Sequence, residues 1–309
     1  HIFGDWSFAA WHELDRKLFL ARDHLGNTGL YYYFKPPLIV FSSDIEAVLD
    51  HTAVPRELDE LHLAQNLGYD LMSKDYSRTF WQGVCLLPAA HAVVLHNHDK
   101  HIDNFWRLDN APPINLKSDE AYLEGFLDHF RRAVRVRLNS IRPVGSTLSA
   151  GLDSSSVTAL AAEALQKKGH TLVAFTSVPV YSVEEYFPGR IVDEWPLAHE
   201  LADNYQNIEH IEISADDITP IQAIKMSLKI FHVPQHAAAN ITWILSMLEK
   251  TRRRDIGVLL TGQLGNGGIS WSGGSNRIFD ILLQNRWAES LMALSDWRKQ
   301  RKLSWFRAI

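Results

Sequence analysis

The sequence predicts two domains of different fold class, an α+β domain over residues 1–112 and an α/β domain with a parallel sheet over residues 113–309. Three observations support this prediction. Short apolar and aromatic runs, separated by turn residues, fill the first third of the chain. Segments typical of strands and of helices alternate in the remainder. Between them, residues 109–115 are polar and rich in proline, which disfavours regular structure and marks a linker.

The first domain is expected to consist of β-hairpins and two helices. Pro36 and Pro37 lack the N–H groups that ladder hydrogen bonds need, so they mark a turn between two strands. Apolar residues recur at helical spacing from Leu58 to Leu67. The expected strands are residues 2–10, 17–21, 29–34, 38–42, 92–95 and 102–106, and the expected helices are residues 43–50 and 58–71.

The second domain is expected to open with a helix that Ser118 caps and whose apolar residues keep helical spacing as far as Leu138. Strands and helices then alternate, and this order predicts a parallel sheet with helices on both faces. The expected strands are residues 144–148, 171–177, 207–213 and 256–261, and the expected helices are residues 155–168, 194–205, 218–230 and 240–254.

The composition disfavours several classes of protein. A net charge of −5 argues against a nucleic-acid partner, and Arg131, Arg132, Arg135 and Arg137 are expected to form only the solvated face of a helix. The sequence contains no run of about eighteen apolar residues, so no membrane span is predicted. The single cysteine, Cys85, allows no internal disulfide, which favours a reducing, cytoplasmic location.

The most informative segment is residues 148–156, Leu-Ser-Ala-Gly-Leu-Asp-Ser-Ser-Ser, which follows a predicted strand and begins a predicted helix. Its small residues let the backbone approach an anion, and a helix N-terminus adds partial positive charge, so a phosphate or pyrophosphate fits there. Asp153 would repel a phosphate unless a cation lay between them, which predicts bound Mg²⁺. The alternative is that Ser154 and Ser155 only cap the helix and that Gly151 only permits a turn.

Residues 149–155 resemble the Ser-Gly-Gly-x-Asp-Ser pyrophosphate loop of the asparagine synthetase family, which includes β-lactam synthetases and lasso-peptide cyclases, with Ala150 in place of one glycine. A kinase-type phosphate loop requires a lysine directly after its glycines, and this loop has none. Five segments resemble the family's glutaminase half in the same order: residues 4–11, 18–26, 30–32, 41–45 and 83–88. The resemblance implies an Ntn-hydrolase-like domain followed by a PP-loop synthetase domain similar to adenine nucleotide α-hydrolases.

The resemblance also implies ATP and Mg²⁺ as cofactors, with Asp153 as a metal ligand. A second family signature, Ser-Gly-Glu-Gly-x-Asp-Glu, corresponds to residues 261–267, but Gln263 and Asn266 replace a glutamate and an aspartate. We assign these two amides to substrate binding; an amide oxygen binds Mg²⁺ more weakly than a carboxylate does. The residues implied to bind the nucleotide are Leu148, Ser149, Gly151, Asp153, Ser154, Ser155, Ser177, Thr261 and Gly262.

Other polar residues have two interpretations each. Asp193 and Glu194 either replace the missing negative charge or simply favour a helix N-terminus. His236 either lines a substrate pocket or packs structurally near the start of its helix. His96 and His98, with His91 and His101 nearby, form either a metal pair or a group of surface histidines on a hairpin.

No catalytic residue is assigned. The family's glutaminase half uses an N-terminal cysteine whose own α-amine is the base, and its synthetase half uses a lysine in a further C-terminal region. The chain opens with His1 and stops at Ile309, so we expect both groups to lie outside it. Cys85 is in the middle of the chain beside apolar residues and is expected to be a small buried hydrophobe.

Together these features predict an ATP-dependent ligase that adenylates the carboxylate of aspartate or of another small molecule or peptide. Pyrophosphate is released, and ammonia from glutamine then displaces AMP to form an amide. Two alternatives stay open: a macrolactam- or β-lactam-forming cyclase that uses an internal amine, and a degenerate nucleotide-binding partner protein. A homodimer is compatible with each of them.

Overall fold

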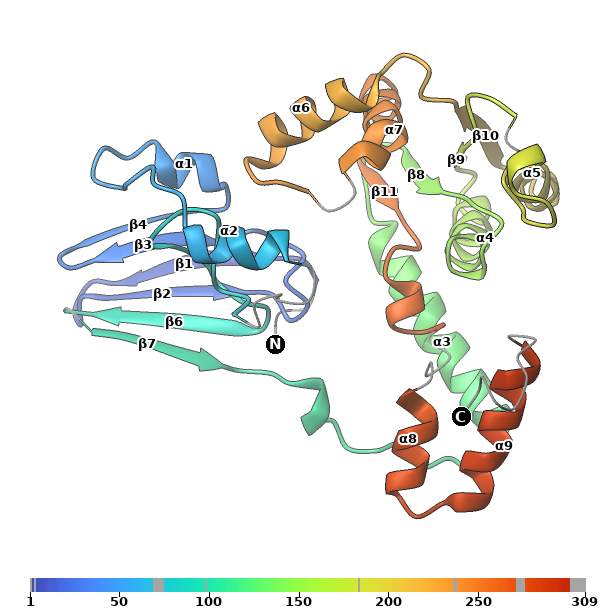
Figure 1. The fold of residues 1–309 in the computed structure, drawn as a ribbon, viewed down its shortest axis with the longest axis horizontal. Coiled ribbons are helices and arrows are strands. Elements are labelled where there is room, and N and C mark those ends of the chain that lie inside the picture. Colours follow the sequence, from blue (N-terminus) through green and yellow to red (C-terminus); the bar gives the residue numbers. More distant parts are fainter. Residues whose placement is uncertain are drawn as a thin grey trace. The chain divides into compact units, whose positions relative to one another are not determined.

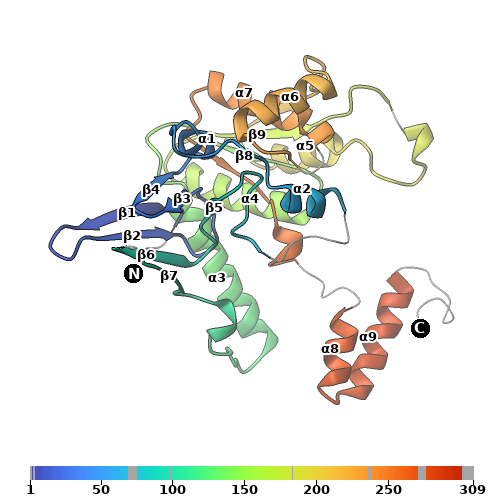
Figure 2. The same cartoon turned by 60° about the vertical axis from the view of Figure 1, so that its left-hand side comes forward.

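The computed structural model describes residues 2, 4–68, 75–97, 99–182, 184–235, 238–270 and 276–300. The chain forms two compact units, which Figures 1 and 2 show as ribbons. The first contains His1–Leu116 and Ile224–Ala238, and the second contains Lys117–Ala223 and Ala239–Ile309. The main segment of the first unit thus ends just after the proline-rich linker, and a short segment from much later in the chain returns to that unit.

The first unit contains two antiparallel sheets. One has the strand order β1-β2-β6-β7 and the other has the order β4-β3-β5. The expected hairpins are confirmed, although the first strand starts five residues later than predicted. The strands are β1 (Ser7–His12), β2 (Lys17–Arg22), β3 (Tyr31–Lys35), β4 (Leu38–Ser42), β5 (Val84–Leu86), β6 (His91–His96) and β7 (Asp99–Asn104).

The two sheets share an apolar core, and a helix covers the outer face of the smaller sheet. Leu20, Tyr32 and Val93, from three different strands, lie in the shared core. On the other face of β3, Tyr33 packs with Val48 of helix α1 (Ile45–Leu49). Strand residues alternate between these two cores because successive side chains in a strand point to opposite faces. Helix α2 (Glu60–Leu67) begins after Asp59, so Leu58 precedes it, and residues 69–71 of the predicted helix lie outside the described residues.

The segment Arg-Asp-His-Leu-Gly, which carries much of the family resemblance, forms a tightly bonded turn after β2. The Asp23 carboxylate accepts hydrogen bonds from the backbone N–H groups of Leu25, Asn27 and Thr28. Burial opposes ionisation of Asp23, but these bonds together outweigh it and hold the pKa of the carboxyl below its usual value. The Arg22 guanidinium donates to the backbone carbonyl oxygen of Leu87 at 2.7 Å. This signature therefore serves the structure of the turn.

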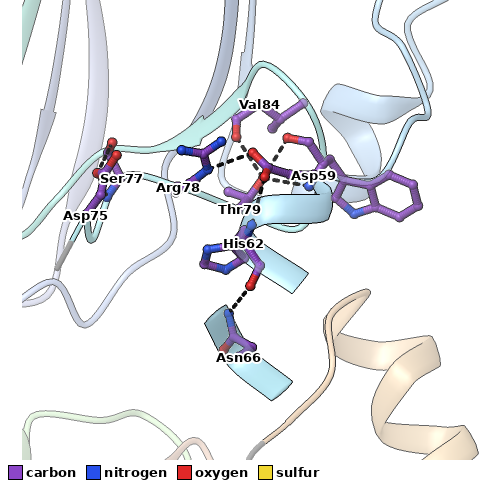
Figure 3. Close-up of polar contacts among 9 residues, drawn as sticks. Asp59, His62, Asn66, Asp75, Ser77, Arg78, Thr79 and Val84 are labelled. Carbon is purple, nitrogen blue, oxygen red and sulfur yellow. Dashed lines mark hydrogen bonds and ion pairs between the residues drawn. The ribbon is translucent and has the colours of Figure 1, made fainter. Parts of the chain in front are cut away.

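A second buried carboxylate fixes the start of α2, as Figure 3 shows. Asp59 Oδ1 accepts from the His62 backbone N–H at 2.8 Å, and its other oxygen lies 2.7 Å from Arg78 Nε. The Asp59 side chain is only 10% exposed. Burial disfavours the charged form, but the Arg78 hydrogen bond and the His62 N–H outweigh that cost and lower the pKa of Asp59. The pair ties the segment before β5 to the first turn of α2.

The second unit is built on a four-stranded parallel sheet, which confirms the prediction of a parallel sheet. Its strand order is β10-β9-β8-β11. The strands are β8 (Val144–Thr147), β9 (Leu172–Ser177), β10 (Ile208–Ile213) and β11 (Val258–Leu260). The helices of this unit are α3 (Asp119–Arg137), α4 (Leu152–Gln166), α5 (Trp195–Asp203), α7 (Thr242–Arg253), α8 (Asn276–Leu283) and α9 (Trp287–Gln300). Helix α6 (Pro220–Phe231) begins in this unit, and from Ile224 onward it belongs to the first unit.

Helices cover both faces of this sheet, as predicted. Leu172 and Ala174 of β9 face α4 and α5, whereas Val173 and Phe175 face Met247 of α7. Because both faces of β9 are buried, residues 172–175 are all apolar instead of alternating, and only Thr176 and Ser177 at its carboxyl end are polar. Ser118 caps α3 by accepting from the Ala121 N–H, also as expected. Among the helices in the described part of the chain, none has both the length and the apolar character needed to cross a membrane.

Candidate nucleotide-binding site

Two loops meet at the carboxyl edge of the parallel sheet. Strand β8 pairs with β9 on one side and with β11 on the other, in registers that match Thr147 with Phe175 and Ser146 with Leu260. The loop after β8 (residues 148–151) and the loop after β11 (residues 261–268) therefore leave the sheet at the same edge. Ligands of open α/β sheets bind at this edge.

The loop after β8 is held by its own serine hydroxyls. Ser154 is buried, and its Oγ accepts from the Ser149 N–H at 3.0 Å and lies 2.6 Å from Ser149 Oγ. Ser149 Oγ also accepts from the Gly151 N–H at 3.1 Å. Ser155 Oγ donates to the Ser149 carbonyl oxygen at 2.8 Å. Ser154 and Ser155 thus tie the loop together, which differs from the alternative in which they only cap a helix.

The loop leads directly into the first turn of α4. Its N-cap residue is Gly151, which has no side chain to occupy the helix end. The N–H groups of residues 152–154 precede the first intrahelical hydrogen bond, so they point out of the helix N-terminus together with the positive end of its dipole. A glycine at the N-cap therefore places no side chain over this end of the helix, where an anion can bind.

The second loop lies directly against this turn. A Cβ atom added at Gly262 would be 2.5 Å from the Ser154 backbone nitrogen and 2.8 Å from its Cα. A Cβ atom at Gly265 would be 2.5 Å from both carboxylate oxygens of Asp153. Leu264, between these glycines, has a left-handed backbone with φ of 64°. Only glycine fits at Gly262, since a side chain there would meet backbone atoms and separate the two loops; a side chain at Gly265 would displace the Asp153 carboxylate.

Asp153 is the one carboxylate in this arrangement of loops among the described residues. It is half-buried in the first turn of α4, next to Gly265. Asn266, one residue further, carries an exposed amide whose Oδ1 accepts from Ser270 Oγ at 3.2 Å. Carboxylate and amide oxygens are donors that suit Mg²⁺, which proteins commonly bind through one or two carboxylates together with the phosphates of the substrate. The residues present fit such an ion.

The remaining predicted site residues have different surroundings. Leu148 is buried, and its N–H donates to the Phe175 carbonyl oxygen at 2.8 Å. Ser177 ends β9 and is half-buried. Thr261 and Gln263 are exposed in the second loop. His236 lies outside the described residues.

The open alternatives for other polar residues can also be compared with the structure. Asp193 Oδ1 accepts from the Trp195 N–H at 2.9 Å, which is a role at the start of α5. His101 Nε2 lies 2.9 Å from Asp103 Oδ1 on the surface of β7. His98 lies outside the described residues, and no group of three or more potential metal ligands occurs in the part of the chain that the structure describes.

Cys85 is half-buried, and burial raises the pKa of its thiol. The four arginines of α3 are exposed, as expected.

Sequence reasoning missed a polar group beneath the loop. Thr176 on β9 and His210 on β10 lie on the same face of the sheet, and the Thr176 hydroxyl donates to the Leu148 carbonyl oxygen at 2.7 Å. The alternation of residues along two adjacent predicted strands could have placed these side chains on one face. It could not have shown that they reach the loop.

The second unit is thus an α/β domain with a serine- and glycine-rich loop at the carboxyl edge of its parallel sheet. Comparison with known sequences makes this more specific: the chain belongs to the asparagine synthase family, whose model matches residues 125–308. A glutamine amidotransferase domain model matches residues 1–106.

Individual relatives are distant in sequence. The chain is similar to the glutamine-hydrolyzing asparagine synthetase 3 of Bacillus subtilis, with 25% identity over 88% of this chain and 44% of that protein. It is similar to the amidase chry2 of Gibberella zeae, with 27% identity over 66% of this chain and 30% of that protein. A glutamine-dependent NAD+ synthetase structure from Acinetobacter baumannii matches with 13% identity and a TM-score of 0.31, over 86% of this chain and 61% of that one. The chain spans less than half the length of these two curated relatives.

Proposed function

We propose that this protein takes part in ATP-dependent amide formation of the asparagine synthetase type. In this reaction a carboxylate oxygen of the substrate attacks the α-phosphorus of ATP, and the bond to pyrophosphate breaks. Ammonia then attacks the acyl carbon, a C–N bond forms, AMP leaves and the nitrogen loses a proton. Aspartate is the leading carboxylate, and glutamine is the leading source of ammonia.

The single observation that carries this proposal is the packing of the second glycine loop on the first turn of α4. At Gly262 the second loop approaches the backbone of α4 so closely that no Cβ atom fits, and Gly265 lies against the Asp153 carboxylate. A helix end needs no such packing for stability alone, because a solvated N-terminus satisfies its N–H groups with water. Two loops that converge at a helix N-terminus suit a polyphosphate, whose several charged oxygens need donors from more than one direction.

Each part of the loop has a defined task in this proposal. The Ser149–Ser154 hydroxyl pair holds the backbone in the shape that directs N–H groups outward. The N–H groups at the start of α4 bind the pyrophosphate portion, which stabilises the charge that develops on it as the bond breaks. Asp153 and the Asn266 amide oxygen would hold Mg²⁺. That ion would supply positive charge to the phosphates.

The amides at Gln263 and Asn266 affect how strongly this site can work. An amide oxygen is a weaker Mg²⁺ ligand than a carboxylate, and it cannot accept a proton as a general base. We therefore propose a site that needs a higher Mg²⁺ concentration than one with carboxylates at both positions. The same difference favours one second candidate, a protein that binds nucleotide without forming AMP.

The experiment that tests the proposal measures product formation from Mg²⁺-ATP. The protein is incubated with aspartate and with either glutamine or ammonium, and AMP, ADP and asparagine are separated. AMP with asparagine supports the proposed reaction. AMP only with another carboxylate, or with a substrate that has an internal amine, favours the lactam-forming alternative.

Two variants make this experiment specific. Asp153→Asn should abolish AMP formation, whereas Asp128→Asn, which removes one negative charge from the exposed surface of α3, should not change it. ATP binding by the wild-type protein without AMP, over a wide range of carboxylates and Mg²⁺ concentrations, would instead establish the nucleotide-binding alternative.

A further inference from the structure

A stack of three rings lies beside β10, away from the two loops just described. His210 of β10 and His199 of α5 lie edge to edge: their rings are 21° apart in orientation, and their Nδ1 atoms are 3.2 Å apart. The Trp195 indole covers both rings, with centroid distances of 4.0 Å to His210 and 5.1 Å to His199. The indole excludes water from one face of the pair and restricts rotation of both imidazoles.

The inner imidazole is connected to the nucleotide loop through one hydroxyl. His210 Nε2 lies 2.7 Å from Thr176 Oγ1, and the same oxygen lies 2.7 Å from the Leu148 carbonyl oxygen. Thr176 is fully buried. Leu148 is the first residue after β8, and its N–H already donates to Phe175. Both polar groups of the Leu148 backbone are therefore held by β9.

Counting protons assigns a direction to every bond in this chain of contacts. The Leu148 carbonyl can only accept, so the one Thr176 hydroxyl proton is donated to it. His210 Nε2 must then donate to Thr176. In the neutral ring, His210 Nδ1 accepts from the His199 Nδ1–H. Burial, and secondly the neighbouring His199, lower the pKa of His210 to about 4, while Asp203 opposes the shift.

We propose that Thr176 is a positioning residue for the nucleotide loop and that the His210–His199 pair keeps its hydroxyl directed at Leu148. This rests on the proposed nucleotide-binding function of the loop. Without the imidazole donor, the hydroxyl can rotate, and the carbonyl of Leu148, the first residue of the loop, loses its fixed hydrogen-bond donor. Within residues 149–155, the described hydrogen bonds join these residues to one another. The direction of the N–H groups in this segment therefore depends on how Leu148, the residue before it, is held.

The test compares pairs of variants that keep or remove each hydrogen bond. Thr176→Val retains shape and loses the hydroxyl, whereas Thr176→Ser keeps it. His210→Phe retains a ring and loses the donor, whereas His210→Gln offers an amide N–H near the position of Nε2. Mg²⁺-ATP affinity is measured by calorimetry, and the melting temperature is measured in parallel.

We expect Thr176→Val and His210→Phe to weaken ATP binding about five- to tenfold, the range for loss of one hydrogen bond. Thr176→Ser and His210→Gln should stay within about twofold of wild type. A purely structural role would lower the melting temperature without this rescue pattern in affinity. ATP binding by folded Thr176→Val that equals wild type overturns the proposal.

A second measurement needs no ligand and no variant. ¹⁵N NMR of the wild-type protein at neutral pH should show His210 as a neutral imidazole protonated at Nε2. Protonation at Nδ1, or a charged ring, overturns the proposal even if Thr176→Val does not fold.

If wild-type protein binds no ATP, the proposed function fails, and amide exchange at Ser149 then decides the positioning role. Faster exchange in Thr176→Val supports it, and equal exchange refutes it.

Discussion

Gly262→Ala tests whether the two loops form one site. The added Cβ atom would lie 2.5 Å from the Ser154 nitrogen and 2.9 Å from the Asp153 carbonyl carbon, and both are backbone atoms that cannot rotate away. Ordinary contact distances between nonbonded heavy atoms are about 3.5 Å, so the loops must separate by about 1 Å. Forced overpacking of this kind costs about 1–3 kcal/mol of unfolding free energy.

Two assays follow from this displacement. For a unit of this size, a loss of about 2 kcal/mol lowers the melting temperature by about 4–8 °C. Mg²⁺-ATP affinity should fall about tenfold or more, because displacements of about 1 Å are enough to misalign a binding geometry. Calorimetric titration and thermal unfolding measure the two effects separately.

Gly267→Ala is the matched control in the same loop. A Cβ atom at Gly267 would have no atom within 4 Å, so neither affinity nor melting temperature should change appreciably. The reasoning is refuted if Gly262→Ala binds ATP and melts as the Gly267→Ala protein does. A lower melting temperature with unchanged affinity would show that the two loops pack together but do not act together on the nucleotide.

Three further predictions concern charge. Asp153→Asn should remove the Mg²⁺ dependence of ATP binding, and unchanged dependence in a titration with metal would exclude Asp153 as a ligand. Asn266→Asp should lower the Mg²⁺ concentration needed for half-maximal ATP binding severalfold, and no shift would place residue 266 away from the ion. Arg78→Met should cost about 2 kcal/mol in unfolding free energy, since it leaves the buried Asp59 carboxylate without its ionic partner. Because the pKa of Asp59 is lowered in the folded state, its contribution is complete above the unfolded pKa and is lost as pH falls through the folded pKa. The stability difference between wild type and Arg78→Met should therefore shrink in acid, and a constant difference would contradict this account.

Much of the fold was predictable because its signals are local. The parallel sheet of the second unit was predictable because segments typical of strands and of helices alternate along the chain, and the structure has such a sheet. The proline pair after Lys35 marked a hairpin turn, and β3 and β4 pair on either side of it. The serine- and glycine-rich loop was recognised for the same reason, since its residues are consecutive and follow a strand.

The sequence alone therefore determined the classes of the two halves, the position of the serine- and glycine-rich loop and the resemblance that the family match confirms. Only the tertiary structure decided which groups touch that loop. Gly262 lies more than a hundred residues from Ser154, and His210 lies more than sixty from Leu148, so their contacts depend on how β8, β9, β10 and β11 pair. Such contacts leave no local pattern, because the residues that meet are neighbours in the sheet and not along the chain.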